Sequence, residues 1–152
     1  MKKIKFAILI AVVLTCAFVF AACGEGGEQK AVFKSFAAAF NACYEDGFKD
    51  ADMEKVAEAF GPSGKEYNDA LSKIKALKSD AAKKGEKVKL TVLSYSGWEI
   101  TEKAATVTIK VRVVETEPGS KDKTNTEEKK VEFRKVGDVW YFDGSLSFTF
   151  FK

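Results

Sequence analysis

The side chains that most often carry out acid–base and nucleophilic chemistry are scarce in this chain. It contains no histidine, so it lacks the usual general base near pH 7 and any Ser-His or Cys-His nucleophile pair. Asp46, Asp50, Asp52 and Asp143 lie at predicted helix starts and turns, where capping and solvent account for them. We therefore expect no enzymatic activity. The alternative is an isomerase or hydrolase based on carboxylates and tyrosine, which would need these acids to converge in a pocket.

Metal and phosphate chemistry has little support either. The cysteines are Cys16, Cys23 and Cys43, and the first two fall in or at the end of a predicted signal segment. One remaining thiol cannot build a zinc site. The glycine-rich stretch 24–27 follows no predicted strand, unlike a phosphate-binding loop. The sequence thus predicts no metal and no cofactor, and Cys43 is expected to be a small buried hydrophobic side chain.

Aromatic side chains could instead supply binding chemistry, because they pack and also hydrogen-bond at the mouth of a pocket. The alternative is that most of them fill a core in a chain with 13 phenylalanines. The candidates for a pocket lining are Tyr67, Trp98, Trp140, Tyr141 and Phe142.

The N-terminal segment differs from the rest of the chain. Three lysines among the first five residues form a basic start, and the 17 residues from Phe6 to Ala22 carry no charge. This order, followed by small residues, is typical of a secretory signal. Seventeen residues barely cross a hydrocarbon core of ~30 Å, so a retained membrane helix is the less favoured alternative. The lysines stay in the cytoplasm in both cases, which makes the domain extracytoplasmic.

The residues that end this segment, Phe20-Ala21-Ala22-Cys23, resemble the signal of bacterial lipoproteins, which is an aliphatic residue, two small residues and cysteine. Phe20 departs from the usual leucine. The resemblance implies cleavage of residues 1–22, diacylglycerol on the Cys23 sulfur and often acylation of the new amino group, as with palmitate. Two or three acyl chains hold a protein on a membrane. The expected location is the cell membrane or outer membrane, lipid-anchored on the extracytoplasmic face, with free secretion as an alternative.

The charge balance argues against nucleic-acid binding. The chain has 25 basic and 22 acidic residues, and three of the basic ones belong to the predicted signal. The mature chain would therefore carry no net charge, whereas a nucleic-acid reader shows an uncompensated basic patch. The expected partners are the membrane, through the anchor, and a small apolar ligand or a protein.

Three helices are predicted after a flexible tether that follows the lipidated cysteine within residues 23–30. Aromatic residues at three-and-four spacing indicate the first helix. Asp50 is expected to cap the second helix, which Gly61-Pro62 ends, and Ser63 with Glu66 is expected to form a capping box for the third. The predicted helices span residues 31–46, 50–60 and 63–84.

After Gly85 the hydrophobic period changes to two, which predicts strands. A bulge is expected at Ser96-Gly97, and residues 115–128 are expected to be a polar, mobile connection. Gly137-Asp138 is predicted to be a two-residue hairpin turn. The predicted strands span residues 88–101, 106–113, 130–134 and 140–150, with a possible bend at Asp143-Gly144 in the last.

Helices first and an antiparallel meander second predict an α+β domain, with three N-terminal helices packed on a curved antiparallel sheet of about four strands. The aromatic-rich first helix, the strand AATVTIKVRV and the hairpin KVEFRKVGDVWYFDG resemble nuclear-transport-factor-2-like lipoproteins, a bacterial group also described as cystatin-like or lumazine-binding-like. The resemblance covers about residues 30–145, within a domain expected over residues 31–152. It implies a cone whose open end can hold a ligand.

Two kinds of function follow from these expectations. The first is a membrane-anchored binding module that holds a small apolar ligand or a partner peptide in the cone. The second is a scaffold or assembly subunit of a cell-surface complex, which would use the outer face of the sheet. A cavity of several hundred cubic ångströms favours the first, and a filled cone favours the second.

Overall fold

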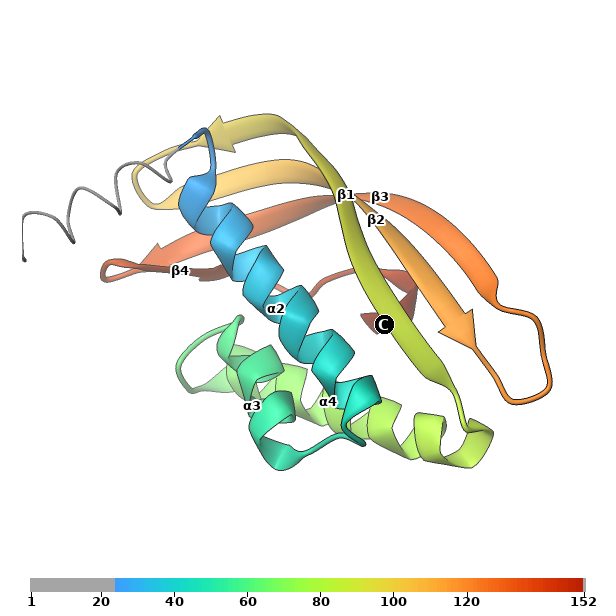
Figure 1. Cartoon of the computed structure of the whole chain (residues 1–152). Coiled ribbons are helices and arrows are strands. Elements are labelled where there is room, and N and C mark those ends of the chain that lie inside the picture. The colour runs from blue at the N-terminus through green and yellow to red at the C-terminus, as the bar shows by residue number, and fades with distance from the viewer. Residues whose placement is uncertain (1–23, 152) are drawn as a thin grey trace, which may run out of the picture.

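The computed structural model describes residues 24–151, so the predicted signal peptide and Cys23 lie outside the described residues. Three helices come first, and a four-stranded antiparallel sheet in the order β1-β2-β3-β4 follows (Figure 1). This confirms the predicted α+β architecture. The elements are α2 (Gly27–Glu45), α3 (Asp50–Glu58), α4 (Lys65–Lys84), β1 (Lys87–Ile100), β2 (Ala104–Thr116), β3 (Lys123–Val136), β4 (Val139–Phe142) and the short 3₁₀ helix η1 (Thr149–Phe151).

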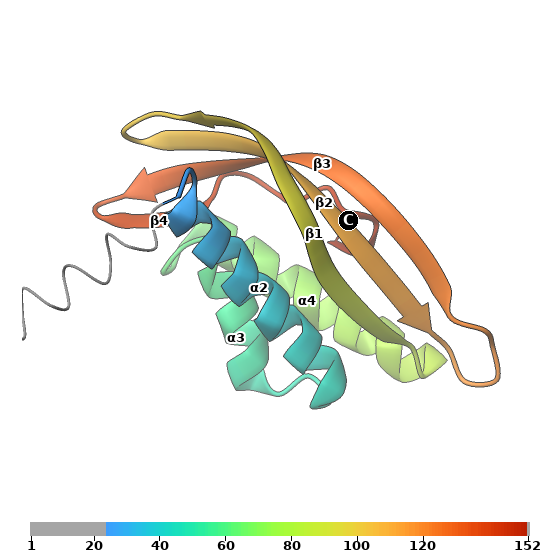
Figure 2. The same cartoon turned by 45° about the horizontal axis from the view of Figure 1, so that its top comes forward.

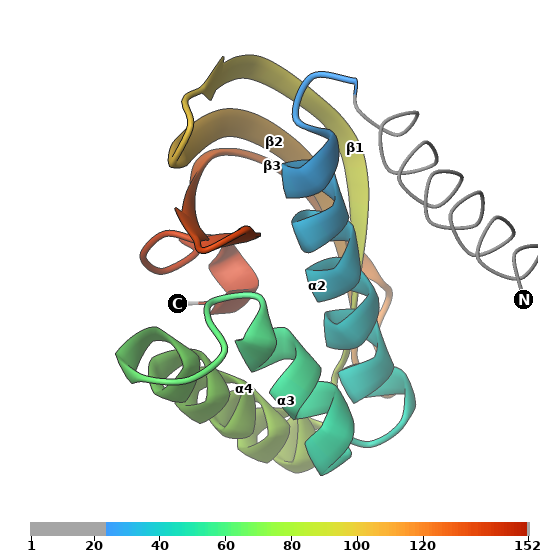
Figure 3. The ribbon, with the colours of Figure 1, turned by 90° about the vertical axis from the view of Figure 1, so that its left-hand side faces the viewer.

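The sheet is curved, and its concave face covers the helices. The three long strands arch together over the helical layer (Figure 2), and α2 runs alongside β1 while α3 and α4 lie across the open side of the curve (Figure 3). Because the strands wrap around the helices, one core forms between the two layers. Within residues 24–151, no helix combines the length and the apolar character that crossing a membrane requires.

The regular parts of this core follow the predicted periodicities. Val107, Ile109, Val111 and Val113 of β2 are all buried on the concave face, as strand alternation requires. On α2, Phe33, Phe36, Phe40 and Cys43 are fully buried in the same core, and Tyr44 is 8 % exposed. The predicted bulge near Ser96 is present, and a second register shift occurs between Val92 and Ser94.

The C-terminal segment differs from the prediction, because β4 ends at Phe142 instead of continuing to residue 150. The amide of Asp143 donates to the carbonyl of Glu132 at 2.8 Å, and Gly144 then adopts a φ of 74° that turns the chain off the sheet. The chain then runs inward, and its apolar side chains enter the concave face. The side chains buried there are Leu146, Phe148, Phe150 and Phe151.

Glu127 of β3 holds this inward segment in place. Its carboxylate is 9 % exposed and accepts hydrogen bonds from the backbone N–H of Thr149 at 3.2 Å and from the Asn125 side chain at 3.1 Å. The amide that begins η1 has no partner within its own turn, so the carboxylate satisfies it.

The polar connection predicted over residues 115–128 is wrong in its second half, because β3 already begins at Lys123 and pairs there with Glu115.

The predicted flexible tether is also shorter than expected. α2 begins at Gly27 and not at residue 31, so residues 27–30 are helical and Gln29 is buried. Gly26 has a φ of 71°, and a Cβ at this position would clash with the indole ring of Trp98. Glu28 accepts a hydrogen bond from the Trp140 indole N–H at 2.9 Å. Two tryptophans that are distant in sequence thus fix the first turn of the helix.

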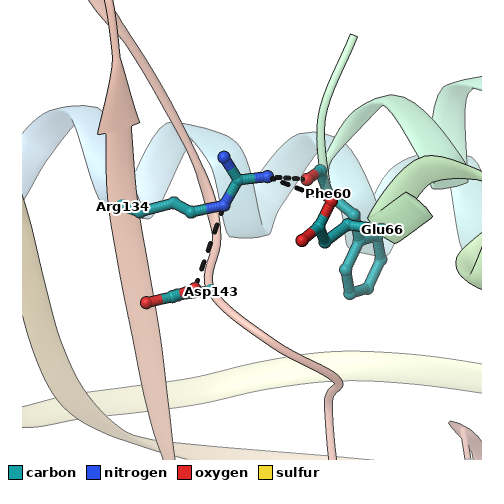
Figure 4. A network of polar contacts seen from close by, with 4 residues as sticks. All are labelled: Phe60, Glu66, Arg134 and Asp143. Atoms are coloured by element: carbon teal, nitrogen blue, oxygen red, sulfur yellow. Dashed lines mark hydrogen bonds and ion pairs between the residues drawn. The ribbon is translucent and has the colours of Figure 1, made fainter. Parts of the chain in front are cut away.

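Neither predicted side-chain cap forms. Asp50 is the first residue of α3, the N-cap position is Lys49, and no side chain caps either α3 or α4. Glu66 instead lies 4.0 Å from the guanidinium of Arg134, which also donates to the Phe60 carbonyl at 2.8 Å and lies 3.9 Å from Asp143 (Figure 4). Arg134 thereby connects β3 to the α3–α4 loop and to the end of β4, and its bond to the Phe60 carbonyl is a partly buried, charge-assisted hydrogen bond.

Candidate functional site

The interior of the curved sheet is filled by aromatic rings. Phe142, one of the predicted pocket residues, is fully buried, with its ring centroid 5.4 Å from that of Phe36 and 5.1 Å from that of Phe60. The Phe151 ring also packs on Phe36, at 5.9 Å between centroids, and the Phe148 ring packs on Phe33, at 6.0 Å. Phe142 therefore belongs to the core and lines no cavity in the centre of the cone.

The other four predicted pocket residues do not converge. Tyr67 on α4 is half-buried against the core. Trp98 stacks on Tyr95 at 5.9 Å, beside the first turn of α2. Trp140 and Tyr141 share a shallow hollow of about 370 Å³ near α2 and α3. The guanidinium of Arg134 lies 5.9 Å from the Tyr141 ring.

A larger open groove lies between α2 and β1. Its volume is about 690 Å³, and small side chains of α2 form one wall while an irregular stretch of β1 forms the other. The alanine side chains of α2 are short, so they leave open space between the helix and the strand. The lining residues are Gly27, Lys30, Ala31, Lys34, Ala37, Ala38 and Asn41 on the helix, and Leu90, Thr91, Val92, Leu93 and Tyr95 on the strand.

Polar contacts close both ends of this groove. At one end the Asn41 side chain donates to the Leu90 carbonyl at 2.9 Å and accepts from the Leu90 amide at 2.8 Å. At the other end the Lys30 ammonium lies 5.7 Å from the Tyr95 ring centroid and 5.5 Å from that of Trp98. α2 rises about 16 Å between Lys30 and Asn41, at 1.5 Å per residue. An extended peptide of about five residues has the same length, at ~3.3 Å per residue.

The strand wall of the groove is a free sheet edge. β1 is the first strand of the sheet and pairs with β2 alone. In an antiparallel pair, alternate residues direct both backbone polar groups away from the partner strand. The Asn41 contacts identify Leu90 as such a residue, so the amide and carbonyl of Val92 also face outward, into the groove. Leu93, the extra residue at the register shift, is 39 % exposed.

The groove is positively charged. Lys30 and Lys34 belong to its lining, and no aspartate or glutamate does. An apolar floor with two ammonium groups and outward backbone groups suits a ligand that carries both a carboxylate and a peptide backbone.

The groups with shifted pKa values offer no acid–base chemistry near neutral pH. Burial raises the pKa of the Tyr95 hydroxyl in the groove and, with nearby carboxylates, that of Tyr44. Both side chains therefore remain protonated. Within the described part of the chain, no group of three or more potential ligating side chains could hold a metal ion. The arrangement can bind, and none of these residues is placed to transfer a proton at pH 7.

The thiol of Cys43 is expected to resist modification in the folded protein. Its side chain has no exposed surface, and burial, with a smaller contribution from the charge of Asp52, raises its pKa from 9.0 to about 12. The pKa of the thiol is higher in the folded protein than in the unfolded chain, so the protonated thiol contributes to the stability of the fold. This contribution is fully present below about pH 9 and is lost as the pH rises toward about 12. Mass spectrometry of the Cys43 peptide after maleimide treatment measures how much of the thiol is modified. Rapid labelling of the native protein at pH 7 would contradict the expected resistance.

Comparison with known proteins identifies the fold. No protein-family model matches the chain, and no curated protein matches its sequence. Solved structures do match. One is a nuclear-transport-factor-2-like protein with a cystatin-like fold from Novosphingobium aromaticivorans, at 14% identity over 88% of this chain and 82% of that chain, with a TM-score of 0.51.

Two further structures have the same arrangement. A protein with a cystatin-like fold from Caulobacter vibrioides matches at 15% identity over 78% of this chain and 85% of that chain, with a TM-score of 0.50. The intermembrane-space region of the chloroplast protein ARC6 matches at 11% identity over 80% and 95%, with a TM-score of 0.54. The chain therefore has the predicted nuclear-transport-factor-2-like, cystatin-like fold, and at these identities the likeness concerns the fold alone.

The groove residues were absent from the sequence-based candidates. Alanines and lysines on a helix are typical of an ordinary solvent-facing surface, so Lys34 and Ala38 carry no recognisable signal. One signal was available. Asn41 lies on the helix face next to the aromatic stripe, where a polar side chain requires a partner, and that partner is the edge of β1.

Proposed function

We propose that this protein is a lipid-anchored, extracytoplasmic binding module that holds an extended segment of a partner protein in the groove between α2 and β1. The observation that carries the proposal is the combination of an apolar groove of about 690 Å³ with a free strand edge along one wall. An extended peptide can add to such an edge through its backbone, while its side chains enter the groove.

A peptide suits the groove better than an acyl chain. The outward amide and carbonyl of Val92 need hydrogen-bonding partners, which a hydrocarbon chain lacks and a peptide backbone supplies. Lys30 and Lys34 favour an acidic side chain or a C-terminal carboxylate at one end. The expected ligand is therefore a segment of about five residues, with apolar residues at alternate positions and a negative charge facing the lysines.

The filled interior explains why the proposed site is a surface groove and not the cone. Phe142, Phe148 and Phe151 occupy the volume that a ligand in the cone would need. The same observation favours a second candidate function, a scaffold subunit of a cell-surface complex. The two candidates differ in the surface used, since the scaffold would bind through the outer face of the sheet. Neither requires catalysis, and we propose that the protein is not an enzyme.

The groove is tested with a fluorescein-labelled acidic peptide of alternating valine and glutamate and with dodecanoate as an acyl probe. The amide signals of β1 from Leu90 to Tyr95 are expected to shift in NMR spectra when the peptide is added. Lys34→Glu should weaken peptide binding about tenfold, because it replaces attraction by repulsion at a partly exposed site. Lys89→Glu, an equal charge change at an exposed residue of β1 outside the groove lining, is the matched control.

Three outcomes would decide against the peptide groove. Shifts of the same amides with dodecanoate but not with the peptide would replace the peptide by an acyl ligand. Equal loss of affinity in both charge variants would mean that attraction is non-specific. Peptide-induced shifts confined to exposed residues of β2 and β3 would favour the scaffold that uses the outer face.

The anchor is tested by Cys23→Ser. The variant should leave the membrane fraction or accumulate unprocessed, and it should no longer incorporate a palmitate analogue, because Cys23 is the proposed acylated residue. Cys16→Ser is the control and should be labelled like the unchanged protein. Labelling that persists in Cys23→Ser would show that another residue carries the lipid.

A further inference from the structure

We infer that the end of the sheet formed by the β1–β2 turn and the β3–β4 hairpin is a lipid-contact surface, which orients the domain on the membrane. This inference rests on the proposed lipid anchor at Cys23 and goes beyond it, because an anchor alone leaves the orientation of the domain free. The proposed occupant of the surface is a phospholipid bilayer.

Exposed apolar side chains gather at this end. Four large hydrophobic residues are exposed among the described residues, and Leu93 belongs to the groove. The other three are Ile100 at 43 %, Val136 at 46 % and Val139 at 52 %. Ile100 ends β1, while Val136 and Val139 pair with each other across the tip of the β3–β4 hairpin. Branched apolar side chains at turn tips are an unfavourable surface in water and a favourable one against lipid.

The two turns form one continuous surface. The backbone N–H of Lys135 donates to the Lys103 carbonyl at 2.8 Å, which fixes the β1–β2 turn against the start of the hairpin. A shallow hollow of about 490 Å³ lies between them, lined by both turns. Lys103 and Lys135 line this hollow together with Glu102 and Asp138, and the Lys135 ammonium lies 5.6 Å from the Trp140 ring centroid. Lysine stems that flank apolar side chains can direct their ammonium groups to lipid phosphates.

The anchor reaches the domain at the same end. Gly26 packs on Trp98 near the end of β1, and Glu28 binds Trp140 of β4. Figure 1 shows the start of α2, the tip of β1 and the β3–β4 hairpin on one side of the molecule, opposite the β2–β3 turn. Gly26 follows Cys23 by three residues, which span at most about 10 Å even when extended. An acylated Cys23 would therefore hold the start of α2, at this end of the molecule, within about 10 Å of the lipid headgroups.

Because the anchor is short, a weak contact between this surface and the bilayer is sufficient to orient the domain. An untethered protein would need a large apolar surface to stay on lipid, whereas an anchored one meets the bilayer at a high effective concentration. Three partly exposed side chains are then enough to select one orientation among those that the anchor allows. The Lys30 end of the α2–β1 groove is the end nearer to this surface, so the groove would run from the membrane outward.

The test places an environment-sensitive fluorophore on the full chain in phospholipid vesicles that contain a doxyl-labelled quencher lipid. Val139→Cys carries the fluorophore at the proposed surface, and Ser120→Cys carries it in the exposed β2–β3 turn at the opposite end. Cys43 is buried and its thiol is protonated, so it does not compete for the label. The Val139 probe is expected to be quenched several-fold more than the Ser120 probe. Val136→Asp should remove this difference, because it replaces an exposed apolar side chain of the surface by a second carboxylate beside that of Asp138.

Flotation with the vesicles and palmitate-analogue incorporation report on the anchor separately. A chain that floats and is acylated, but whose two probes are quenched equally, would overturn the lipid-contact surface and leave the anchor intact. A chain that is neither acylated nor associated with the vesicles would overturn the anchor and, with it, the surface. Stronger quenching at Ser120 than at Val139 would show the opposite orientation.

Discussion

Phe36→Ala is expected to lower the free energy of unfolding of the domain by about 5 kcal/mol. The Phe36 ring has no exposed surface and lies at the centre of the aromatic core. Truncating a buried phenylalanine to alanine typically costs ~3–5 kcal/mol, and whole domains have a free energy of unfolding of about 5–15 kcal/mol. We expect the upper part of that cost, because several neighbouring rings lose a partner at once. Their centroids lie 5.4–6.0 Å from that of Phe36, and they belong to Phe33, Phe40, Phe60, Phe142 and Phe151.

Urea unfolding followed by circular dichroism measures this effect. Lys123→Ala is the control, because Lys123 is an exposed residue at the start of β3 and its side chain contributes nothing to the core. Its unfolding midpoint should stay close to that of the unchanged protein. Equal midpoints for the two variants would mean that Phe36 does not occupy the core.

Ending the chain after Ser145 is expected to prevent folding altogether. The deletion removes four buried apolar side chains, those of Leu146, Phe148, Phe150 and Phe151, and leaves the concave face of the sheet exposed. It also removes the Thr149 amide that bonds to Glu127, so a buried carboxylate loses a partner. The summed cost exceeds the stability of an ordinary domain.

The truncated chain should show a collapsed NMR spectrum and bind a hydrophobic dye. Ser147→Ala and Thr149→Ala serve as controls, because both side chains are exposed and only the Thr149 backbone contacts Glu127. These variants should keep the unchanged spectrum. A folded, cooperatively melting protein that ends at Ser145 would show that the inward segment is dispensable, and it would reopen the cone as a ligand site.

Sequence periodicity predicted the elements whose residues face the core at regular spacing. Alternation from Val107 to Val113 identified β2, and the phenylalanines of α2 identified the helix face, because burial selects side chains at these intervals in any context. Gly85 correctly marked the end of α4, since its φ of 66° is readily available to glycine.

The same reasoning failed where distant residues decide the local structure. Residues 27–30 have no apolar side chain, yet Trp98 and Trp140 hold them in a helix. The alternation of apolar and polar residues after Phe142 is typical of a strand. The chain nevertheless leaves the sheet at Gly144, and its apolar side chains fill the concave face. Residues 123–128 look like a loop by composition and are a strand because β2 offers them a partner. Of the five candidates for a pocket lining, Phe142 is fully buried in the core, which is the alternative that the sequence left open.

Because the chain turns inward after Phe142, the folding of this protein depends on residues that are synthesised last. Synthesis proceeds from the N-terminus, so α2 and its phenylalanines are present long before Phe148 and Phe151 are available to cover them. A chain that lacks these residues corresponds to the variant ending at Ser145, which is expected to stay unfolded. If the protein is exported as we propose, the growing chain would thus remain extended enough to pass through a translocation channel, and it would fold only after residue 151 has passed.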